Sequence, residues 1–555
     1  MDKIFQFDYI IVGAGSAGCA LARRLVENSD ATVCLIEAGP KDSNPLIHIP
    51  FGVALLSKFT KTNWGYYTAP QTQLDNRCLF WPRGKVMGGS SSVNAMCYIR
   101  GDQRDYDSWA QTTSEHWAWS NVLSIFKQSQ ANAQYDAPYH PDYHGDGGPL
   151  GVTDLRHQDP LSHDFVAAAQ HAGLPHNADF NGALRYGVGF YQVTHVNGTR
   201  CSAAKGYIKP IITHPRLTVK TNALVCKVLL EGKTAQGVEV EEQGRRSQLI
   251  ASKEVLLAGG AINSPQLLLL SGIGPQAELA KHHIECVYDL PGVGQNLQDH
   301  LDVIIQVKTK QAVGYGALPR LLPKFMRGLW QYATARKGLF SSNVAEAGGF
   351  AFSRHGSQDC PDLQFHFIPA VLLDHGREIA SDYGFGLHVC HLYPYSRGNI
   401  TLASADPHAA PVIDPNYLND SRDAEAMIDA VRLGIKILQQ PGFAKYAPVP
   451  MAPACQTLTD EEILAFVQAQ AQTVYHPVGT CKMGREDDPM AVVDPCLNVH
   501  GIKGLRVVDA SIMPTIVGGN TNAPTIMIAE QAAHFILGET NTTVSLLEPD
   551  EEPLV

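Results

Sequence analysis

The first forty residues alternate between short apolar runs and a glycine-rich turn. Residues 8–12, Asp-Tyr-Ile-Ile-Val, form a β-branched run that predicts a strand, and Ala, Leu and Arg at helical spacing follow to about Glu27. A second apolar run, residues 32–37, predicts another strand. Because a strand, a helix and a strand in this order form a parallel βαβ unit, the pattern indicates an α/β fold.

The turn within this unit reads Gly13-Ala-Gly-Ser-Ala-Gly18, which is the spacing of dinucleotide-binding turns. Gly13 permits the tight turn, Gly15 lets a pyrophosphate approach the backbone, and Gly18 lets the helix pack on the sheet. Glu37 follows Gly18 by nineteen residues, where its carboxylate is expected to accept ribose hydroxyls and repel a 2′-phosphate. The complete βαβ unit indicates that the turn binds a dinucleotide, and the Glu37 carboxylate disfavours NADP.

Two further segments are rich in glycine and small residues. Residues 84–95 combine glycines with three consecutive serines, a composition that lets the backbone press against a ligand. Residues 255–266 read as a buried strand, a glycine turn and a helix, with Ser264 and Pro265 suited to its first positions. We therefore expect one nucleotide-binding lobe assembled from segments that are distant in the sequence.

Composition narrows the class of protein. The 555 residues are 45% apolar and 17% charged, with 49 glycines and 34 prolines, which is typical of a large, turn-rich globular protein. The formal charge of −11 argues against a nucleic-acid partner. The twelve cysteines are scattered singly and acidic residues precede the first apolar run, so we expect reduced thiols, no signal peptide and a cytoplasmic location. His140 and His144 flank Pro141, which breaks a helix, and we expect no metal site.

At this point the chain resembles the glucose-methanol-choline oxidoreductases. The segments that carry the resemblance are two signature-like stretches, the first with Met87 where Leu is usual, and three shorter motifs: 84–94, 260–274, 291–300, 475–481 and 518–525. Within the family the chain is most similar to choline-dehydrogenase-like alcohol dehydrogenases of bacterial alkane and aliphatic-alcohol oxidation.

The resemblance implies FAD and a mixed α/β fold with two lobes. A Rossmann-like FAD-binding lobe would be assembled from discontinuous segments, and a substrate lobe would combine an antiparallel sheet with helices. The expected boundaries are 1–155, 215–303 and 480–540 for the FAD lobe, 156–214 and 304–479 for the substrate lobe, and 541–555 for a disordered acidic tail.

The resemblance also places the chemistry. His476 matches the family's catalytic histidine and is expected to act as base or alkoxide stabiliser, while Asn520 is expected to hold the substrate oxygen. Val93 stands where some relatives carry a histidine bonded to the flavin, so we predict noncovalent FAD. The glycine-rich unit and the resemblance together predict cofactor contacts at Gly13, Gly15, Ser16, Ala17, Gly18, Glu37, Ala38, Trp64, Gly88, Gly89, Ser90, Asn94, Ala95, Met96, Val225, Asp509, Ala510 and Thr521.

Together these features predict an FAD-dependent dehydrogenase that converts a primary aliphatic alcohol to its aldehyde. Choline is the alternative substrate, since Glu346 is a candidate carboxylate for an ammonium group. Another class, a flavin-containing lyase or a fatty-acid photodecarboxylase, shares the scaffold. The presence of both His476 and Asn520 favours redox chemistry.

One segment points to a membrane. Residues 303–345 contain no Asp or Glu but seven Lys or Arg residues, and within them Leu322, Phe325, Met326 and Leu329 recur at helical spacing. For residues 318–337 this pattern predicts a helix in peripheral contact with the cytoplasmic membrane. The resemblance to alkane-oxidation enzymes favours this contact and implies a quinone-type electron acceptor rather than oxygen, because apolar alcohols and quinones both partition into membranes. The alternative is a stripe that packs on the substrate lobe below a solvated, charged face.

Overall fold

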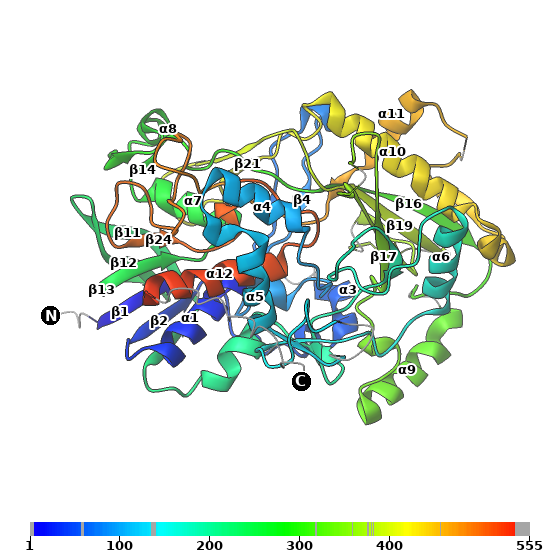
Figure 1. Ribbon diagram of the computed structural model, residues 1–555, viewed down its shortest axis with the longest axis horizontal. Helices are drawn as coiled ribbons and strands as arrows, with labels where there is room; N and C mark the ends of the chain where they lie inside the picture. Colours follow the sequence, from blue (N-terminus) through cyan, green and yellow to red (C-terminus); the bar gives the residue numbers. More distant parts are fainter. Residues whose placement is uncertain are drawn as a thin grey trace, which may run out of the picture.

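Two large β-sheets lie side by side along the long axis of the molecule (Figure 1). The computed structural model describes residues 5–56, 60–134, 140–316, 319–357, 359–374, 377–378, 380, 382–455 and 457–538. The expected tail, residues 541–555, lies outside this part of the chain, as does Leu318.

The first sheet has seven strands and begins with the predicted βαβ unit. Its order is β10-β2-β1-β13-β12-β11, with β24 paired to β13, and its strands are β1 (Phe5–Val12), β2 (Val33–Glu37), β10 (Leu217–Thr221), β11 (Ala223–Glu231), β12 (Thr234–Glu242), β13 (Arg245–Leu257) and β24 (Leu505–Val507). Strands β10, β2, β1, β13 and β24 run parallel, whereas β11 to β13 form an antiparallel meander. Strand β2 lies between two parallel neighbours and is buried throughout, which explains its apolar sequence up to Ile36.

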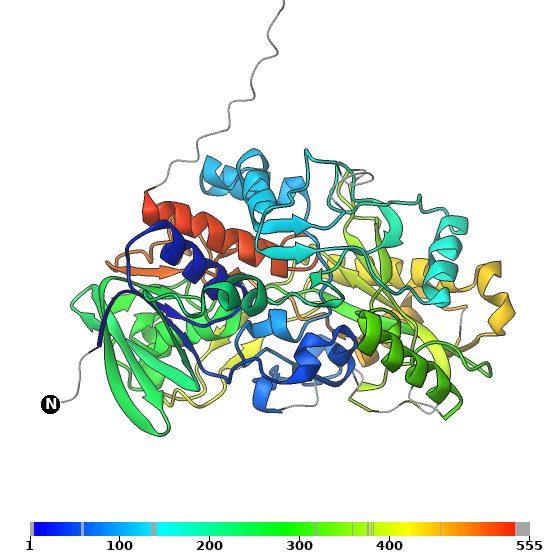
Figure 2. The same cartoon turned by 90° about the horizontal axis from the view of Figure 1, so that it is seen from below.

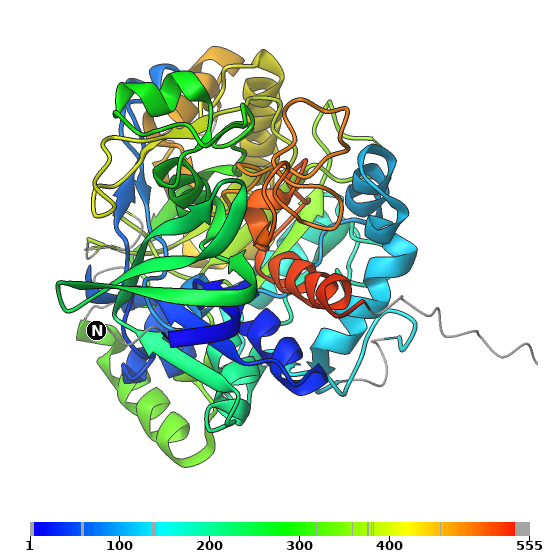
Figure 3. The ribbon, with the colours of Figure 1, turned by 90° about the vertical axis from the view of Figure 1, so that its left-hand side faces the viewer.

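Two helices from opposite ends of the chain pack together against this sheet. They are α1 (Ser16–Asn28) and α12 (Asn522–Leu537), seen next to the sheet in Figure 3. A third helix, α7 (Gly260–Leu270), follows β13. It begins four residues before the Ser264 expected to start it, and Pro265 therefore lies inside its first turns. Pro265 is the sixth residue of the helix, beyond the N–H groups that have no partner within it, so its ring removes one backbone hydrogen bond from α7.

The second sheet is antiparallel and carries the other core. Its order is β22-β16-β19-β18-β17-β7, with β23 paired to β16, and its strands are β7 (Gly187–Phe190), β16 (Leu301–Thr309), β17 (Ala347–Ala351), β18 (Leu363–Ile368), β19 (Tyr383–His391), β22 (Val449–Ala452) and β23 (Gln472–Thr473). The helices α6 (Pro160–His171) and α10 (Ser421–Leu438) cover it, while α9 (Leu322–Ala335) lies at the edge of the molecule (Figures 1 and 2).

The remaining helices surround these layers. They are α2 (Pro45–His48), α3 (Val53–Leu56), α4 (Gln103–Thr112), α5 (Trp119–Ser129), α8 (Gln276–Lys281) and α11 (Asp460–Gln470). Short strand pairs complete the fold: β3 (Tyr66–Tyr67) with β4 (Phe80–Trp81), β5 (Gln130–Asn132) with β6 (Leu150–Val152), β8 (His195–Val196) with β9 (Thr199–Arg200), β14 (Ile273–Gly274) with β15 (Tyr288–Asp289), and β20 (Asn399–Thr401) with β21 (Val412–Asp414). Among the described helices, none is both long and apolar enough to cross a membrane.

The arrangement is the expected mixed α/β fold. Every strand of the first sheet comes from the segments expected to form the FAD lobe, although they are separated by hundreds of residues. The numbered lobe boundaries given above stay a prediction. Residues of both sheets line one shared cavity, which is where the candidate site lies.

Candidate active site

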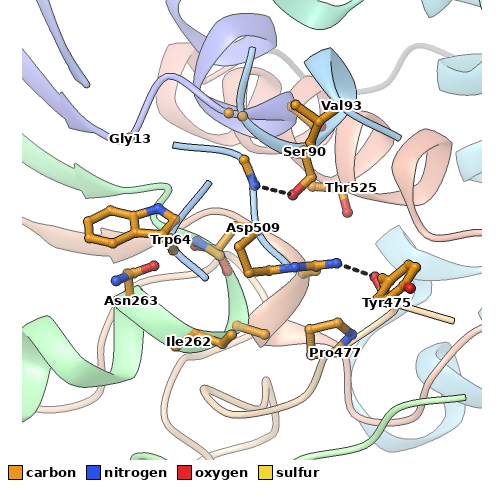
Figure 4. Close-up of a pocket in the computed structure, with 18 of the residues that line it drawn as sticks. Gly13, Trp64, Ser90, Val93, Ile262, Asn263, Tyr475, Pro477, Asp509 and Thr525 are labelled. Atoms are coloured by element: carbon orange, nitrogen blue, oxygen red, sulfur yellow. Dashed lines mark hydrogen bonds between the residues drawn. The ribbon is translucent and has the colours of Figure 1, made fainter. Parts of the chain in front are cut away.

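The site is a cavity of about 450 Å³ that reaches from the first sheet to the second. Its lining includes the last residues of β1, β2 and β13 and the N-terminal residues of α1 and α12, together with His366 of β18 and His388 of β19. Ligands of α/β proteins bind at the carboxyl ends of parallel strands, and this cavity begins there. The close-up in Figure 4 shows residues from both ends around the same space.

The turn at Gly13 has the geometry that its sequence predicts. Gly13 has φ of +104°, and a Cβ there would lie 2.4 Å from the carbonyl oxygen of Ala258. A Cβ on Gly15, by contrast, would find no atom nearer than 4.0 Å, because this backbone faces the cavity. The turn therefore needs glycine for its own conformation at Gly13 and for ligand approach at Gly15.

Two helix N-termini meet at this end of the cavity. Ser16 begins α1 and Asn522 begins α12, and the Ser16 hydroxyl donates to Asn522 Oδ1 over 2.7 Å. Both residues line the cavity, with Thr521 and Thr525 beside them. Because the N-terminal end of a helix presents unpaired N–H groups and partial positive charge, the paired ends form an anion-binding site.

The second glycine-rich segment packs directly on the first. Gly88 donates its N–H to the carbonyl of Ala14 over 2.7 Å, and a Cβ on Gly89 would lie 2.7 Å from Gly15 Cα. Ser90 Oγ accepts a hydrogen bond from the Gly84 N–H at 3.3 Å, one of the dashed lines in Figure 4. The two turns thus form one continuous wall of backbone.

Two buried carboxylates hold this wall together. Glu37 accepts the N–H groups of Ala14 at 3.1 Å and of Gly39 at 2.8 Å, and burial raises its pKa to about 7. Asp509 accepts the Gly260 N–H at 2.8 Å and the Ser264 hydroxyl at 2.5 Å, and burial raises its pKa as well. Asp509 therefore fixes the first turn of α7, a role that the sequence did not predict.

Trp64 and Asn263 lie together in the wall of the cavity (Figure 4). The Trp64 ring stacks on Tyr66 with centroids 5.7 Å apart, and Lys85 Nζ lies 4.3 Å from its centre. Val225 also lines the cavity. Trp64 thus contacts both an aromatic ring and a cation, and it also lines the cavity.

His476 lies at the other end of the cavity and is almost fully buried. Its Nδ1 is 2.9 Å from Nδ1 of His300, and its backbone N–H donates to Asp299 Oδ1 over 2.7 Å. Burial, with smaller contributions from His300, His366 and Arg83, holds the pKa of His476 well below its usual range. The imidazole is therefore neutral near pH 7 and able to accept a proton.

Asn520 faces His476 across this end of the cavity. Its Nδ2 is 3.3 Å from His476 Nε2, and its Oδ1 accepts a hydrogen bond from Gln364 Nε2 at 3.1 Å. Gln364 belongs to β18, so the antiparallel sheet orients the amide. A hydroxyl within hydrogen-bonding reach of both His476 Nε2 and Asn520 Nδ2 would meet an acceptor and a donor, the pair of groups that alcohol deprotonation requires.

The cavity brings together most of the residues predicted from the sequence. Those that line it are His476, Asn520, Gly13, Gly15, Ser16, Ala17, Glu37, Ala38, Trp64, Gly89, Ser90, Asn94, Ala95, Met96, Val225, Asp509, Ala510 and Thr521. Gly18 and Gly88 do not line it. Gly18 allows the close approach of α1 to Ala258 at the end of β13, and Gly88, with φ of +88°, forms the turn before Gly89.

Several residues close to His476 and Asn520 were not predicted from the sequence. His366 and His388 come from neighbouring strands of the second sheet, and both line the cavity. Asp299 and His300 stand at the end of the 291–300 motif, which the sequence analysis used for the resemblance alone. That motif was the available signal, but nothing in its spacing relates it to residue 476.

The cavity fits FAD. Open space lies where a Cβ would stand on Gly15 and Gly260, both in the lining, and two helix N-termini supply an anion site beside them. Glu37, His476 and Asn520 all line it, so the residues that would hold a dinucleotide share one cavity with the His476–Asn520 pair.

Comparison with known proteins agrees with this geometry. Two family models described as GMC oxidoreductase match residues 7–302 and 394–529. The chain belongs to the GMC oxidoreductase family. With its nucleotide-binding cavity, it is an FAD-dependent oxidoreductase of that family.

Individual GMC oxidoreductases resemble the chain over nearly its whole length. An alcohol dehydrogenase [acceptor] of Pseudomonas putida is 50% identical over 96% of both chains. The mitochondrial choline dehydrogenase of Mus musculus is 44% identical over 96% of this chain and 90% of its own. A solved structure of Aspergillus oryzae formate oxidase, studied for its FAD modification, superposes with a TM-score of 0.88 at 28% identity, over 96% of this chain and 98% of that chain.

Proposed function

We propose that this GMC oxidoreductase oxidises a primary aliphatic alcohol to its aldehyde and passes the electrons to a quinone-type acceptor rather than to oxygen. The observation that carries the proposal is the pairing of His476 Nε2 with Asn520 Nδ2 at one end of a dinucleotide cavity. The similarity to an alcohol dehydrogenase [acceptor] supports an alcohol substrate and an acceptor other than oxygen.

Asn520 and His476 have separate roles in the proposed alcohol oxidation. When bound, FAD supplies the acceptor for the hydride of the alcohol carbon. Asn520 Nδ2 donates a hydrogen bond to the alcohol oxygen, and neutral His476 takes the hydroxyl proton at Nε2. The buried aliphatic and aromatic residues around them exclude water, which strengthens both interactions.

The surroundings of Glu346 support an uncharged substrate over choline. Both carboxylate oxygens are occupied: one by the hydroxyls of Tyr315 and Ser342, the other by the Ser162 hydroxyl at 2.8 Å and the Asp159 N–H at 2.7 Å. Glu346 is fully buried and does not line the cavity. Among the described lining residues, the carboxylates are Glu37 and Asp509, both on the nucleotide side.

Anaerobic flavin bleaching tests the substrate class. The purified protein is mixed without oxygen with ethanol, 1-butanol, 1-octanol, benzyl alcohol or choline, and flavin absorbance is followed. We expect the aliphatic primary alcohols to bleach the flavin fastest. Faster bleaching by choline would reverse the substrate assignment, and no bleaching by any alcohol would favour a lyase or a photodecarboxylase.

The acceptor and the flavin linkage are tested separately. Reoxidation by a soluble ubiquinone analogue should be much faster than hydrogen peroxide production in air, whereas rapid peroxide production would indicate an oxidase. Since Val93 offers no nucleophile to the flavin, acid precipitation should release the FAD into the supernatant. Flavin retained in the pellet would contradict a noncovalent linkage.

We also propose peripheral contact of the 318–337 segment with an anionic membrane surface, for a protein located in the cytoplasm. In the described part of this segment, four large apolar side chains of α9 are exposed: Leu322 by 60%, Met326 by 60%, Leu329 by 50% and Trp330 by 67%. The helix packs on the protein through Gly328, Tyr332 and Phe325, whose ring contacts Phe51 and Phe340. The alternative of a fully packed stripe does not fit these exposures.

Basic side chains flank this apolar surface. Arg320, Arg327 and Lys337 are exposed, whereas Lys324 is bound to Asp159 Oδ2 at 2.7 Å. Exposed cations beside exposed apolar groups match the two components of an anionic bilayer surface, and each cation contributes about 1 kcal/mol.

Sedimentation with vesicles tests this contact. The holoenzyme should sediment with vesicles of phosphatidylglycerol at low salt and less with phosphatidylcholine. Trp330→Ser should weaken binding, while the matched control Leu184→Ser, which alters a 77% exposed leucine outside α9, should not. No binding to the vesicles, or equal binding by Trp330→Ser and Leu184→Ser, would contradict the proposed membrane contact.

A further inference from the structure

His300 touches the proposed base but not the cavity. It lies immediately before β16, is fully buried, and is absent from the lining of the cavity. Its ring stands edge-on to that of His476, with centroids 5.1 Å apart and planes at 89°. Both of its nitrogens have partners: Nδ1 is 2.9 Å from His476 Nδ1, and Nε2 is 2.9 Å from the carbonyl oxygen of Leu392.

These contacts fix where the protons lie. The Leu392 carbonyl can only accept, so His300 Nε2 carries a hydrogen and donates it. Burial keeps His300 neutral by lowering its pKa to about 3, and a neutral imidazole carries one N–H. His300 Nδ1 is therefore an acceptor, which requires His476 Nδ1 to be the donor. The lone pair of His476 is then on Nε2.

The other side of His476 gives the same assignment independently. Gln364 Nε2 donates to Asn520 Oδ1 at 3.1 Å, so the amide group of Asn520 turns its Nδ2 toward His476. That Nδ2 is a donor and lies 3.3 Å from His476 Nε2. A donor at this distance requires a lone pair on Nε2, which is the tautomer that the His300 side imposes.

We propose that His300 is a positioning residue that sets the tautomer of His476, so that the lone pair of the base faces the cavity. Asp299 beside it holds the His476 backbone through the 2.7 Å hydrogen bond, while His300 holds the ring. When Nε2 takes the hydroxyl proton, the ring becomes an imidazolium whose Nδ1–H still donates to His300, so no second proton moves. The kinetic consequence rests on the proposed function, but the tautomer itself does not.

Two variants of matched size separate this role from mere packing. His300→Asn keeps an acceptor oxygen near the position of Nδ1. His300→Leu introduces a side chain similar in size and branching to asparagine but without an acceptor. We expect His300→Leu to lower the limiting rate of anaerobic flavin reduction by about 10- to 100-fold, the scale of one unsatisfied buried donor, and His300→Asn to stay within about fivefold of wild type. FAD content and melting temperature report whether each variant folds.

A direct readout of the tautomer does not depend on activity. In ¹⁵N-histidine-labelled holoenzyme, with His476→Ala to identify the signals, we expect wild type and His300→Asn to show an unprotonated Nε2 and a protonated Nδ1. His300→Leu should shift the proton toward Nε2. If His300→Leu does not fold, His300→Gln replaces it, because its longer side chain reaches toward Leu392 and leaves Nδ1 of His476 without an acceptor.

The outcomes are separable. An unchanged tautomer in His300→Leu, or equal rate losses in the leucine and asparagine variants, would overturn the inference. Wild-type enzyme that no alcohol reduces, with the predicted tautomer present, would instead refute the proposed function and leave the tautomer assignment standing.

Discussion

The two ends of the cavity recognise their ligands by different means. At the nucleotide end, the wall is backbone: the turns at Gly13 and Gly89 and the first turns of α1 and α12. At the end that holds His476 and Asn520, the groups proposed to act are side chains from separate segments, with Gln364 orienting Asn520.

This difference explains which end a sequence reveals. A backbone wall needs particular φ angles and the absence of Cβ atoms, so it leaves glycines at fixed short spacings. A side-chain network needs only that distant residues meet after folding, and any one of its members is a common residue type. Changes at the nucleotide end should therefore affect how much FAD is bound, and changes at the catalytic end how fast it is reduced.

The largest expected effect is at His476. His476→Ala should lower the limiting rate of flavin reduction by about 10²–10⁴, because the alcohol then has no positioned base. FAD content should stay near that of wild type. Stopped-flow reduction without oxygen measures the rate, with His408→Ala, an exposed histidine, as the control. A wild-type rate in His476→Ala would refute its role.

Asn520→Ala should have the next largest effect. Loss of its hydrogen bond to the developing alkoxide corresponds to roughly 2–4 kcal/mol, or about 30- to 1,000-fold in the reduction rate. Gln364→Leu removes only the hydrogen bond that orients the amide, so we expect about 3- to 10-fold. The assignment fails if the Gln364 variant is slower than the Asn520 variant.

Gly13→Ala tests the opposite end. Its Cβ would lie 2.4 Å from the Ala258 carbonyl oxygen, and its φ of +104° strains any other residue by about 1–3 kcal/mol. We expect FAD affinity to fall by about tenfold or more while the reduction rate per bound flavin stays unchanged. Gly232→Ala, at φ of +56° with no atom within 4 Å of the new Cβ, should leave FAD affinity unaltered.

Glu37→Gln should have a smaller effect on the same property. The carboxylate accepts two backbone N–H groups, and the amide keeps one acceptor and turns a donor toward the other N–H. The loss of one hydrogen bond predicts about 3- to 10-fold weaker FAD binding, measured by titration of the apoprotein. A change in the reduction rate without a change in FAD affinity would contradict this assignment, because Glu37 would then affect catalysis and not FAD binding.

The smallest expected effect is that of pH. A lowered pKa means that His476 stays unprotonated as the pH falls, so the limiting reduction rate should change by less than about twofold between pH 8 and pH 6.5, the usual pKa of histidine. The rate should decline only at lower pH. Half-loss of the rate near pH 6.5 or above would show a base that titrates normally.

Much of the site could be read from the chain before its structure. The βαβ unit follows from its motif, and the resemblance pointed to His476, Asn520 and many of the cavity residues. The structure brings these residues together, and their roles stay predictions. The start of α7 did not follow, because Asp509, which accepts the Gly260 N–H, is 249 residues away. The sequence makes Glu346 a candidate for binding an ammonium group, but in the folded chain its carboxylate already accepts four hydrogen bonds.

The sequence by itself determined the dinucleotide turn, since the conformations that glycine allows and the steric limits on its neighbours act within a few residues. Tertiary structure alone decided that His300 meets His476 across 176 residues, that Gln364 orients Asn520 across 156, and that the apolar side of α9 is exposed. Burial and side-chain hydrogen bonds depend on which surfaces the folded chain brings into contact, and no local spacing encodes that choice.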